Sequence, residues 1–208
     1  TMHPKTINMD EAKKNNIISV SINEFAKHGY VNASTNTIVK AAGISKGLLF
    51  HYFAHKQGLF SYVYNYCVDL IATELIAKID LNQRDILVRL RDTMLVKIEL
   101  SEKFPQIFDF VARVYVEEAD EVKNLISQKE QAAIADSYAT LITDIDYSLF
   151  KAEIDVQKAI KVIIWTLEKF GAEVLSQTSD PNLKDLDYQA ILSEANTYLK
   201  LFRECFYK

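Results

Sequence analysis

Residues that interrupt helices are scarce in this sequence of 208 residues. It contains five glycines and three prolines, and four of the glycines lie at or before position 58. Glycine and proline are the residues least compatible with a helix interior, so the chain beyond position 58 has little to break a helix. Apolar residues recur at helical spacing through most of that stretch. The composition therefore predicts an all-α protein.

Cysteine and long apolar runs are also nearly absent. Cys67 and Cys205 are the only cysteines, which excludes a disulfide framework and favours a reducing compartment. No uncharged apolar run approaches the roughly 20 residues that a membrane-spanning helix needs. The N-terminal residues show no apolar run after Lys5, so we expect no secretory signal. These absences predict a cytoplasmic protein without a membrane partner.

Arginine is missing from the first 60 residues, where seven lysines stand against three acidic residues. The rest of the chain carries 17 basic and 25 acidic residues, and all four histidines lie in the basic N-terminal part. A basic end joined to an acidic body suggests a polyanionic partner for that end alone. A lysine-rich face is more often simply solvated, so the charge needs a motif to support it.

The expected helices follow from periodicity and end signals. Four are expected in the first part of the chain, at 7–27, 35–42, 46–53 and 56–79. Asn82, Pro105 and Asp155 are plausible starts of later helices, Pro105 because proline suits a first helical turn. Two long helices are expected at 156–175 and 186–206, separated by a loop at 178–185.

Residues 35–53 have the pattern of a helix–turn–helix. Ser34 or Thr35 caps the first helix, Gly43 supplies a left-handed turn residue, and Ser45 caps the second helix. Within the second helix Leu49 and Phe53 are four apart and share the inward face. The opposite face then carries Gly47, Leu48, Phe50 and His51.

Apolar side chains that point away from a core require another explanation, and duplex DNA supplies one. Leu48 and Phe50 could contact thymine methyl groups, while His51 could reach a phosphate or a base edge. Lys46 and Lys56 bracket the helix and are expected to contact phosphates. The helix N-terminus after Ser45 is itself suited to an anion.

The run from 25 to 60, FAKHGYVNASTNTIVKAAGISKGLLFHYFAHKQGLF, resembles the N-terminal domain of the TetR family of bacterial transcriptional regulators. The resemblance implies a three-helix DNA-binding domain at 1–55 and an all-helical effector-binding and dimerisation domain at 56–208. It implies a dimer that binds a palindromic operator as a repressor and is released by a small, largely apolar effector. The DNA contacts that it implies are Thr35, Ser45, Lys46, Gly47, Leu48, Phe50, His51, Tyr52 and Lys56.

Two departures from the family pattern bear on base recognition. Position 50 is commonly tyrosine in the family and is Phe50 here, which removes a hydroxyl contact to phosphate. The absence of arginine from the DNA-binding region removes the usual bidentate contact to guanine. We therefore expect modest base recognition that favours thymine.

The last two long helices are the expected dimer interface. Their apolar stripes could form a four-helix arrangement about a two-fold axis, although an internal core alone would also explain them. The residues expected at the contact are Leu167, Gly171 and Val174, together with residues around Leu199 and Phe202.

An effector pocket is expected where aromatic side chains meet a carboxylate. Trp165 points off the main stripe of its helix, and Glu168 lies one turn further on. With Tyr66, Phe108 and Tyr115 they could enclose an elongated apolar ligand with a cationic or hydroxyl end. The competing interpretation places Trp165 at the dimer contact and leaves Glu168 solvated.

Two other classes of function compete with this interpretation. His51 and His55 have the spacing of a helical metal pair, but the expected break near Ala54 puts them on different helices, and Tyr52 replaces the glutamate of a zinc protease motif. We therefore expect no catalytic residue, no metal site and no cofactor. A constitutive DNA-binding regulator without an effector is the remaining alternative.

Overall fold

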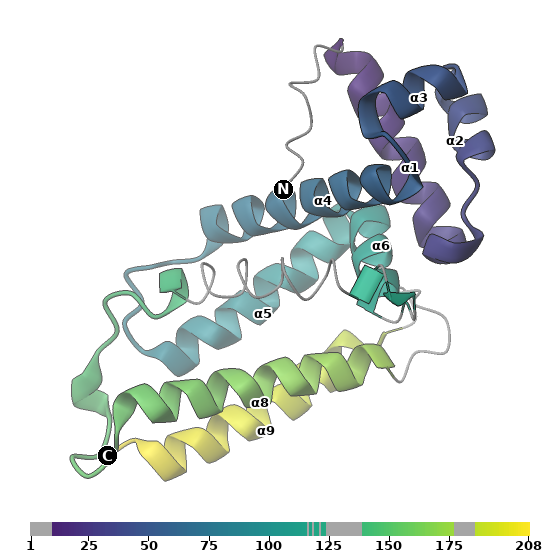
Figure 1. Cartoon of the computed structure of the whole chain (residues 1–208). Coiled ribbons are helices and arrows are strands. Elements are labelled where there is room, and N and C mark those ends of the chain that lie inside the picture. Colours follow the sequence, from purple (N-terminus) through teal and green to yellow (C-terminus); the bar gives the residue numbers. More distant parts are fainter. Residues whose placement is uncertain (1–9, 116, 118, 121, 124–138, 177–185) are drawn as a thin grey trace. The chain divides into compact units, whose positions relative to one another are not determined.

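The computed structural model describes residues 10–115, 117, 119, 120, 122, 123, 139–176 and 186–208, and its ordered elements there are helical (Figure 1). The loop expected at 178–185 lies outside the described residues. An isolated antiparallel bridge joins Phe150 to Tyr207. The elements are α1 (Glu11–Asn32), α2 (Thr35–Ala42), α3 (Lys46–Phe53), α4 (Lys56–Lys78), α5 (Ile86–Lys103), α6 (Pro105–Tyr115), a 3₁₀ turn (Tyr147–Leu149), α8 (Val156–Ser176) and α9 (Tyr188–Phe206).

These helices form two compact units. The first comprises residues 1–71 and 104–129, and the second comprises residues 72–103 and 130–208. This division differs from the expected domains at 1–55 and 56–208, because most of α4 and all of α6 belong to the N-terminal unit. Helix α4 runs through the division point and contributes residues to both units.

Aromatic packing explains why α6 belongs to the first unit. Phe25 of α1, Phe60 of α4 and Phe110 of α6 are buried, and their ring centroids lie 5.0 to 6.1 Å apart. Edge-to-face and tilted contacts of this kind stabilise a core beyond the burial of apolar area. The helix–turn–helix residues Ile38 and Leu49 join the same buried cluster.

Helix α1 extends beyond the expected end at Lys27 and continues to Asn32 across a break at Gly29. Gly29 has φ 68° and ψ −179°, a conformation that is open almost only to glycine. The break turns the Tyr30 N–H toward Glu117, whose carboxylate accepts it at 2.6 Å. A carboxylate from the segment after α6 thus holds the last turn of α1.

Ser21 is the one buried side chain whose polar atom lacks a hydrogen bond within the described part of the chain. It lies on the inward stripe of α1 with Ile17, Ile18 and Phe25, as the sequence pattern predicts.

We expect Ser21→Ala to stabilise the protein by about 1 kcal/mol, because it removes an unpaired hydroxyl from an apolar site and favours the helix. Urea unfolding would measure the change. Ser19→Ala, at an exposed position of the same helix, is the matched control. A lower stability for Ser21→Ala would mean that the hydroxyl has a bonding partner.

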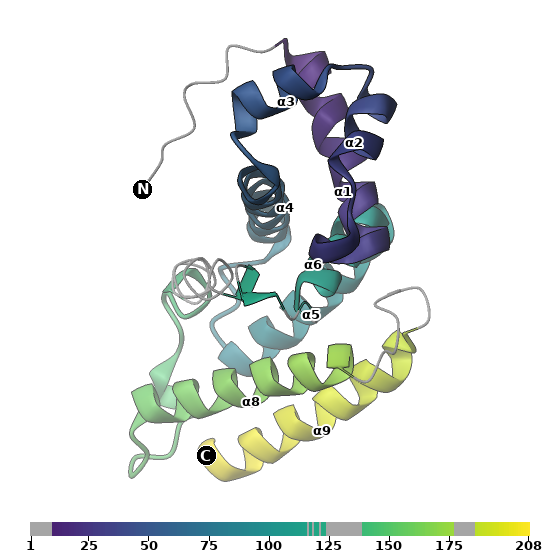
Figure 2. The same ribbon diagram turned by 45° about the vertical axis from the view of Figure 1, so that its right-hand side comes forward.

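The second unit is built on α5, α8 and α9. Helices α8 and α9 lie side by side in both views (Figures 1 and 2). Helix α9 also packs on α5, where the Ser101 and Tyr188 hydroxyls lie 3.1 Å apart. Ile160 and Ile163 of α8 and Ala195 of α9 are buried, as expected for helices with an apolar stripe.

Helix α5 begins at Ile86, four residues after the expected start at Asn82, because the Asp85 side chain accepts the N–H groups of Leu87 and Val88. Asp85 also receives Arg203 at 2.8 Å and the Tyr207 hydroxyl at 2.8 Å. Burial alone would raise the pKa of Asp85, but these two hydrogen bonds outweigh it and hold that pKa below its ordinary value. The carboxylate therefore anchors the end of α9.

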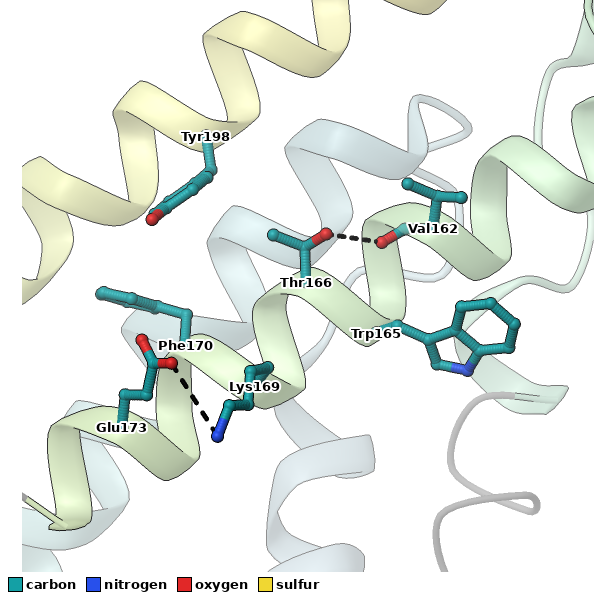
Figure 3. Close-up of a pocket in the computed structure, with 7 residues that line it drawn as sticks. All are labelled: Val162, Trp165, Thr166, Lys169, Phe170, Glu173 and Tyr198. Atoms are coloured by element: carbon teal, nitrogen blue, oxygen red, sulfur yellow. Dashed lines mark hydrogen bonds and ion pairs between the residues drawn. The ribbon is translucent and has the colours of Figure 1, made fainter.

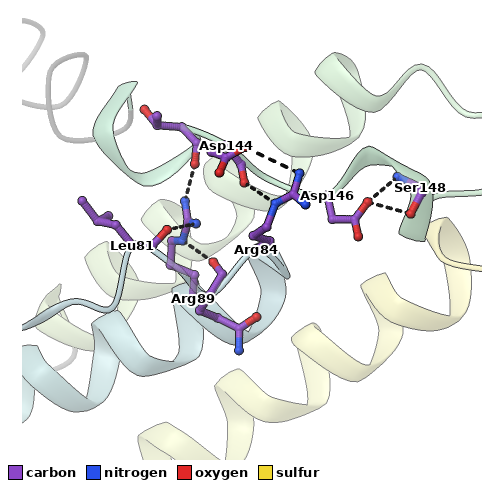
Figure 4. Close-up of polar contacts among 8 residues, drawn as sticks. Leu81, Arg84, Arg89, Asp144, Asp146 and Ser148 are labelled. Carbon is purple, nitrogen blue, oxygen red and sulfur yellow. Dashed lines mark hydrogen bonds and ion pairs between the residues drawn. The ribbon is translucent and has the colours of Figure 1, made fainter.

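A buried arginine joins two connecting segments of the second unit (Figure 4). Arg89 is 1% exposed, and its guanidinium donates to four carbonyl oxygens at 2.7 to 2.8 Å. The acceptors belong to Leu81 and Gln83 before α5 and to Leu141 and Thr143 further along the chain. One side chain thus fixes two segments that are about 60 residues apart.

Candidate nucleic-acid interface

The helix–turn–helix has the local structure that its sequence predicts. The Ser34 hydroxyl accepts the Thr37 N–H at 3.4 Å, and the Ser45 hydroxyl accepts the Leu48 N–H at 3.1 Å. Gly43 ends α2 with φ 66° and ψ 33°, the left-handed conformation typical of this position. The predicted caps and turn are therefore confirmed.

Two long-range hydrogen bonds fix the first of these helices on α1. Glu24 accepts the backbone N–H of Ser34 at 2.8 Å, and the Asn16 side chain donates to the Ala42 carbonyl at 3.1 Å. Each end of α2 is thereby tied to α1. Glu24 is one of only three acidic residues in the first 60, and its carboxylate binds the start of α2.

Helix α3 turns Leu49 and Phe53 into the core, as predicted. Its opposite side exposes Lys46, Gly47 and His51. The predicted apolar DNA-facing residues are less free than the spacing suggests. Leu48, Phe50 and Tyr52 are all half-buried. Phe50 and Tyr52 pack against the core cluster.

Two ring contacts hold the exposed groups of α3. The Lys46 ammonium lies 5.9 Å from the centroid of the Phe50 ring, and the His51 and Tyr52 rings meet at 5.2 Å. Of the remaining expected contacts, Thr35 is half-buried at the start of α2 and Ser45 is exposed. Lys46, Gly47 and His51 thus form the accessible edge of α3.

Lys56 occupies a more constrained position than the sequence suggests. Its ammonium donates to the Val31 carbonyl at 2.9 Å and lies 5.0 Å from the centroid of the Tyr30 ring. Lys56 therefore joins the start of α4 to the last turn of α1. Any phosphate contact by this residue would compete with those interactions.

Residues 17–63 match the family described as bacterial regulatory proteins of the tetR family. This part of the chain is similar to the N-terminal domain of TetR-family regulatory proteins. The match spans the helix–turn–helix and the start of α4, where the predicted caps and turn lie. No curated protein matches the sequence significantly.

Solved structures share the fold of this chain over nearly its whole length. A TetR family transcriptional regulator from Chloroflexus aurantiacus is 19% identical, covers 97% of this chain and 96% of its own, and gives a TM-score of 0.59. A TetR-like transcriptional regulator from a Rhodococcus species is 14% identical, covers 93% of this chain and 97% of its own, and gives a TM-score of 0.64. The regulator FadR from Bacillus subtilis, in complex with stearoyl-CoA, is 16% identical, covers 91% of this chain and 97% of its own, and gives a TM-score of 0.64.

The residues expected to bind an effector divide between the two units. Tyr66, Phe108 and Tyr115 belong to the first unit, where Tyr66 and Tyr115 are exposed. Trp165 and Glu168 belong to the second unit on α8.

Trp165 is 62% exposed and borders a shallow hollow of about 390 Å³ on the surface of α8 and α9 (Figure 3). The hollow contains an ion pair at 3.8 Å between Lys169 and Glu173. Its lining comprises Val162, Trp165, Thr166, Lys169, Phe170, Glu173 and Tyr198. The surroundings of Trp165 resemble an interaction surface more than an enclosed ligand site.

Sequence reasoning overlooked Lys97, which is exposed in the middle of the inward stripe of α5. The signal was present in the sequence, because a lysine stands where the helical period calls for an apolar residue.

Two other expectations concern metals and membranes. Helix α3 ends at Phe53 and His55 accepts the Gly58 N–H at its Nδ1, so His51 and His55 do lie on different segments. The described residues contain no group of three or more potential metal-ligating His, Cys, Asp or Glu side chains. Nor does any helix among them have the length and apolarity to span a bilayer.

Proposed function

We propose that this protein is a dimeric repressor that binds a palindromic operator through α3 and is released by a small, largely apolar effector. The observation that carries the proposal is the capped α3, which presents Lys46, Gly47 and His51 on one accessible edge of a helix–turn–helix. A helix presented this way fits the major groove, and the unpaired amides after Ser45 suit a phosphate.

Phosphate contact by α3 predicts a salt-dependent loss when Lys46 is removed. We expect Lys46→Ala to weaken binding to a random-sequence duplex and to lower the salt slope by about one unit, because one fewer counterion is released. Fluorescence anisotropy at several salt concentrations would measure both. Lys161→Ala, at an exposed position of α8, is the matched control. Unchanged affinity and slope for Lys46→Ala would remove this residue from the interface.

Lys56→Ala should weaken DNA binding too, and it should also lower stability because it breaks the contacts with Val31 and Tyr30. Comparing the two lysine variants therefore separates a direct phosphate contact from support of the unit. Equal melting temperatures combined with a lower salt slope would assign Lys56 a direct contact.

The proposed dimer contact uses α8 and α9, and of the residues expected there Leu167 and Val174 are half-exposed and Gly171 is exposed. Leu199 and Phe202 are buried inside the protomer and cannot be offered to a partner. The apolar residues that remain outside are Val162, Trp165 and Leu201, of which Trp165 and Leu201 are more than half exposed. A face of this kind on two helices that lie side by side is suited to a second copy.

We expect Trp165→Glu to convert the dimer to a monomer, because it places a charge on the centre of that face. Sedimentation velocity would measure the change. Gly171→Leu is the informative comparison, since Gly171 is exposed and a Cβ there meets nothing within 4 Å in the protomer. A dimer that survives Trp165→Glu but not Gly171→Leu would restore the interface expected from the sequence.

The effector part of the proposal is supported by one neighbour in fold. FadR from Bacillus subtilis binds stearoyl-CoA within the same fold. Helix α4 contributes to both units, so a shift of this helix would couple an occupied second unit to α3. Native mass spectrometry of the purified protein, followed by operator release with the identified compound, tests it. A protein whose DNA binding no apolar compound alters would be the constitutive alternative.

A further inference from the structure

The end of α6 contacts the backbone of α1 at the point where α1 leads into the helix–turn–helix. Helices α1 and α6 pack against each other within the first unit (Figures 1 and 2). Glu117, two residues beyond α6, accepts the N–H of Tyr30 at 2.6 Å. A backbone N–H that donates to a carboxylate forms a charge-assisted bond, which is roughly twice as strong as a bond between neutral groups.

The break in α1 makes this contact possible. In a regular helix the N–H of Tyr30 would bond to the carbonyl four residues earlier. Gly29, at φ 68°, interrupts that pattern just before Tyr30. A Cβ at Gly29 would lie 2.9 Å from Glu117 Oε2 and 3.4 Å from Arg113 Nε. The absence of a side chain at position 29 therefore lets the end of α6 reach the backbone of α1.

The last turn of α1 determines where α2 begins. Only Ala33 and Ser34 separate the two helices. Ala33 is buried, and its N–H donates to the Gly29 carbonyl at 3.2 Å. The same turn binds the start of α4, where the Lys56 ammonium donates to the Val31 carbonyl. A shift of this turn would therefore move the start of α2 with it.

We infer that Glu117 is a positioning residue for DNA binding, because its carboxylate holds the last turn of α1 and thereby fixes where α2 and α3 are presented. The inference rests on the proposed DNA-binding function and adds a residue that lies far outside the helix–turn–helix in sequence. It also predicts a sign. Removing a negative charge from a DNA-binding unit normally strengthens binding, because it reduces repulsion of the phosphates. Removing the charge of Glu117 is expected to weaken binding instead.

Glu117→Gln tests the inference on the duplex that the wild-type protein selects most strongly from a random library. Fluorescence anisotropy should show binding weakened about 3- to 10-fold, because the Tyr30 N–H loses its charged acceptor. The salt slope should stay that of the wild type, since no phosphate contact is lost. Asp120→Asn, at an exposed position of the same unit, is the matched control for lost negative charge. It should leave binding unchanged or slightly tighter.

Hydrogen exchange locates the effect within the chain. Glu117→Gln should speed amide exchange in residues 30–42, which cover the last turn of α1 and α2, and should leave α8 and α9 unchanged. Circular dichroism at the binding temperature shows whether each variant is folded. While nearly all of the protein is folded, a lower global stability does not change the apparent affinity.

A double variant tests whether Gly29 and Glu117 act through one contact. Gly29→Ala combined with Glu117→Gln should bind DNA about as weakly as Gly29→Ala alone, because both changes disturb the same hydrogen bond. Losses that add in full would show that Glu117 acts elsewhere and would overturn the inference.

The remaining outcomes separate the inference from the function on which it rests. If Glu117→Gln binds like the wild type or like Asp120→Asn, the inference fails and the DNA-binding function stands. Weaker binding with a lower salt slope, or with faster exchange across the whole chain, also overturns it, because either result indicates a lost phosphate contact or general damage. If the wild type binds no duplex, the proposed function and the inference both fail.

Discussion

Replacing Arg89 with methionine is expected to destabilise the second unit by about 3–5 kcal/mol. In the wild type the guanidinium donates to four carbonyl oxygens at 2.7 to 2.8 Å. Methionine keeps the apolar stem but leaves these four oxygens without their donor. Each buried acceptor left without a partner costs about 1–3 kcal/mol, and solvent reaches some of them after the change. Urea unfolding followed by circular dichroism would measure the loss.

The chain supplies a matched control for Arg89. Arg84 lies nearby, donates to the Asp144 carbonyl at 3.1 Å and pairs with its carboxylate at 3.5 Å, but its side chain is half exposed. Arg84→Met should therefore cost under about 1 kcal/mol, as exposed ion pairs usually do. Arg89→Lys should fall between the two, because an ammonium reaches fewer of the four acceptors. Equal small losses for Arg89→Met and Arg84→Met would contradict the assigned role.

Gly29→Ala is expected to destabilise the first unit by about 3 kcal/mol. Alanine at φ 68° and ψ −179° is strained, at a cost on the order of 1–3 kcal/mol. The new Cβ would also lie 2.9 Å from the Glu117 carboxylate and would disturb its hydrogen bond with the Tyr30 N–H. Thermal unfolding would show the loss, and DNA binding should weaken with it because α1 supports α2.

Gly43 provides the comparison for Gly29. It has φ 66° and ψ 33°, and a Cβ there would meet nothing within 4 Å. Asparagine tolerates this left-handed conformation, so Gly43→Asn should cost under about 1 kcal/mol. Glu117→Gln separates the two parts of the Gly29 effect, since it leaves the backbone unstrained and weakens only the hydrogen bond. A Gly29→Ala variant as stable as Gly43→Asn would show that the break in α1 can relax.

Local signals in the sequence were sufficient for the elements of the helix–turn–helix. A serine cap and a left-handed glycine act within a few residues, so Gly43 and Ser45 could each be assigned from their neighbours alone. The sequence offered Ser34 and Thr35 as caps of α2, and the structure selects Ser34. The burial of Leu49 and Phe53 followed from helical periodicity for the same reason. The start of α5 was misplaced, because Asn82 and Asp85 are both acceptable caps and only the contacts of Asp85 with Arg203 and Tyr207 select it.

The sequence by itself determined the all-α class, the family of the N-terminal domain and the local helix ends, because these depend on composition and on residues close along the chain. Only the tertiary structure decided which residues are free to act. It buried Leu199 and Phe202, engaged Lys56 with Val31, joined α6 to the N-terminal core and left Lys97 accessible on an inward face. These outcomes depend on contacts between segments far apart in the chain, and helical periodicity carries no information about which neighbour a face will meet.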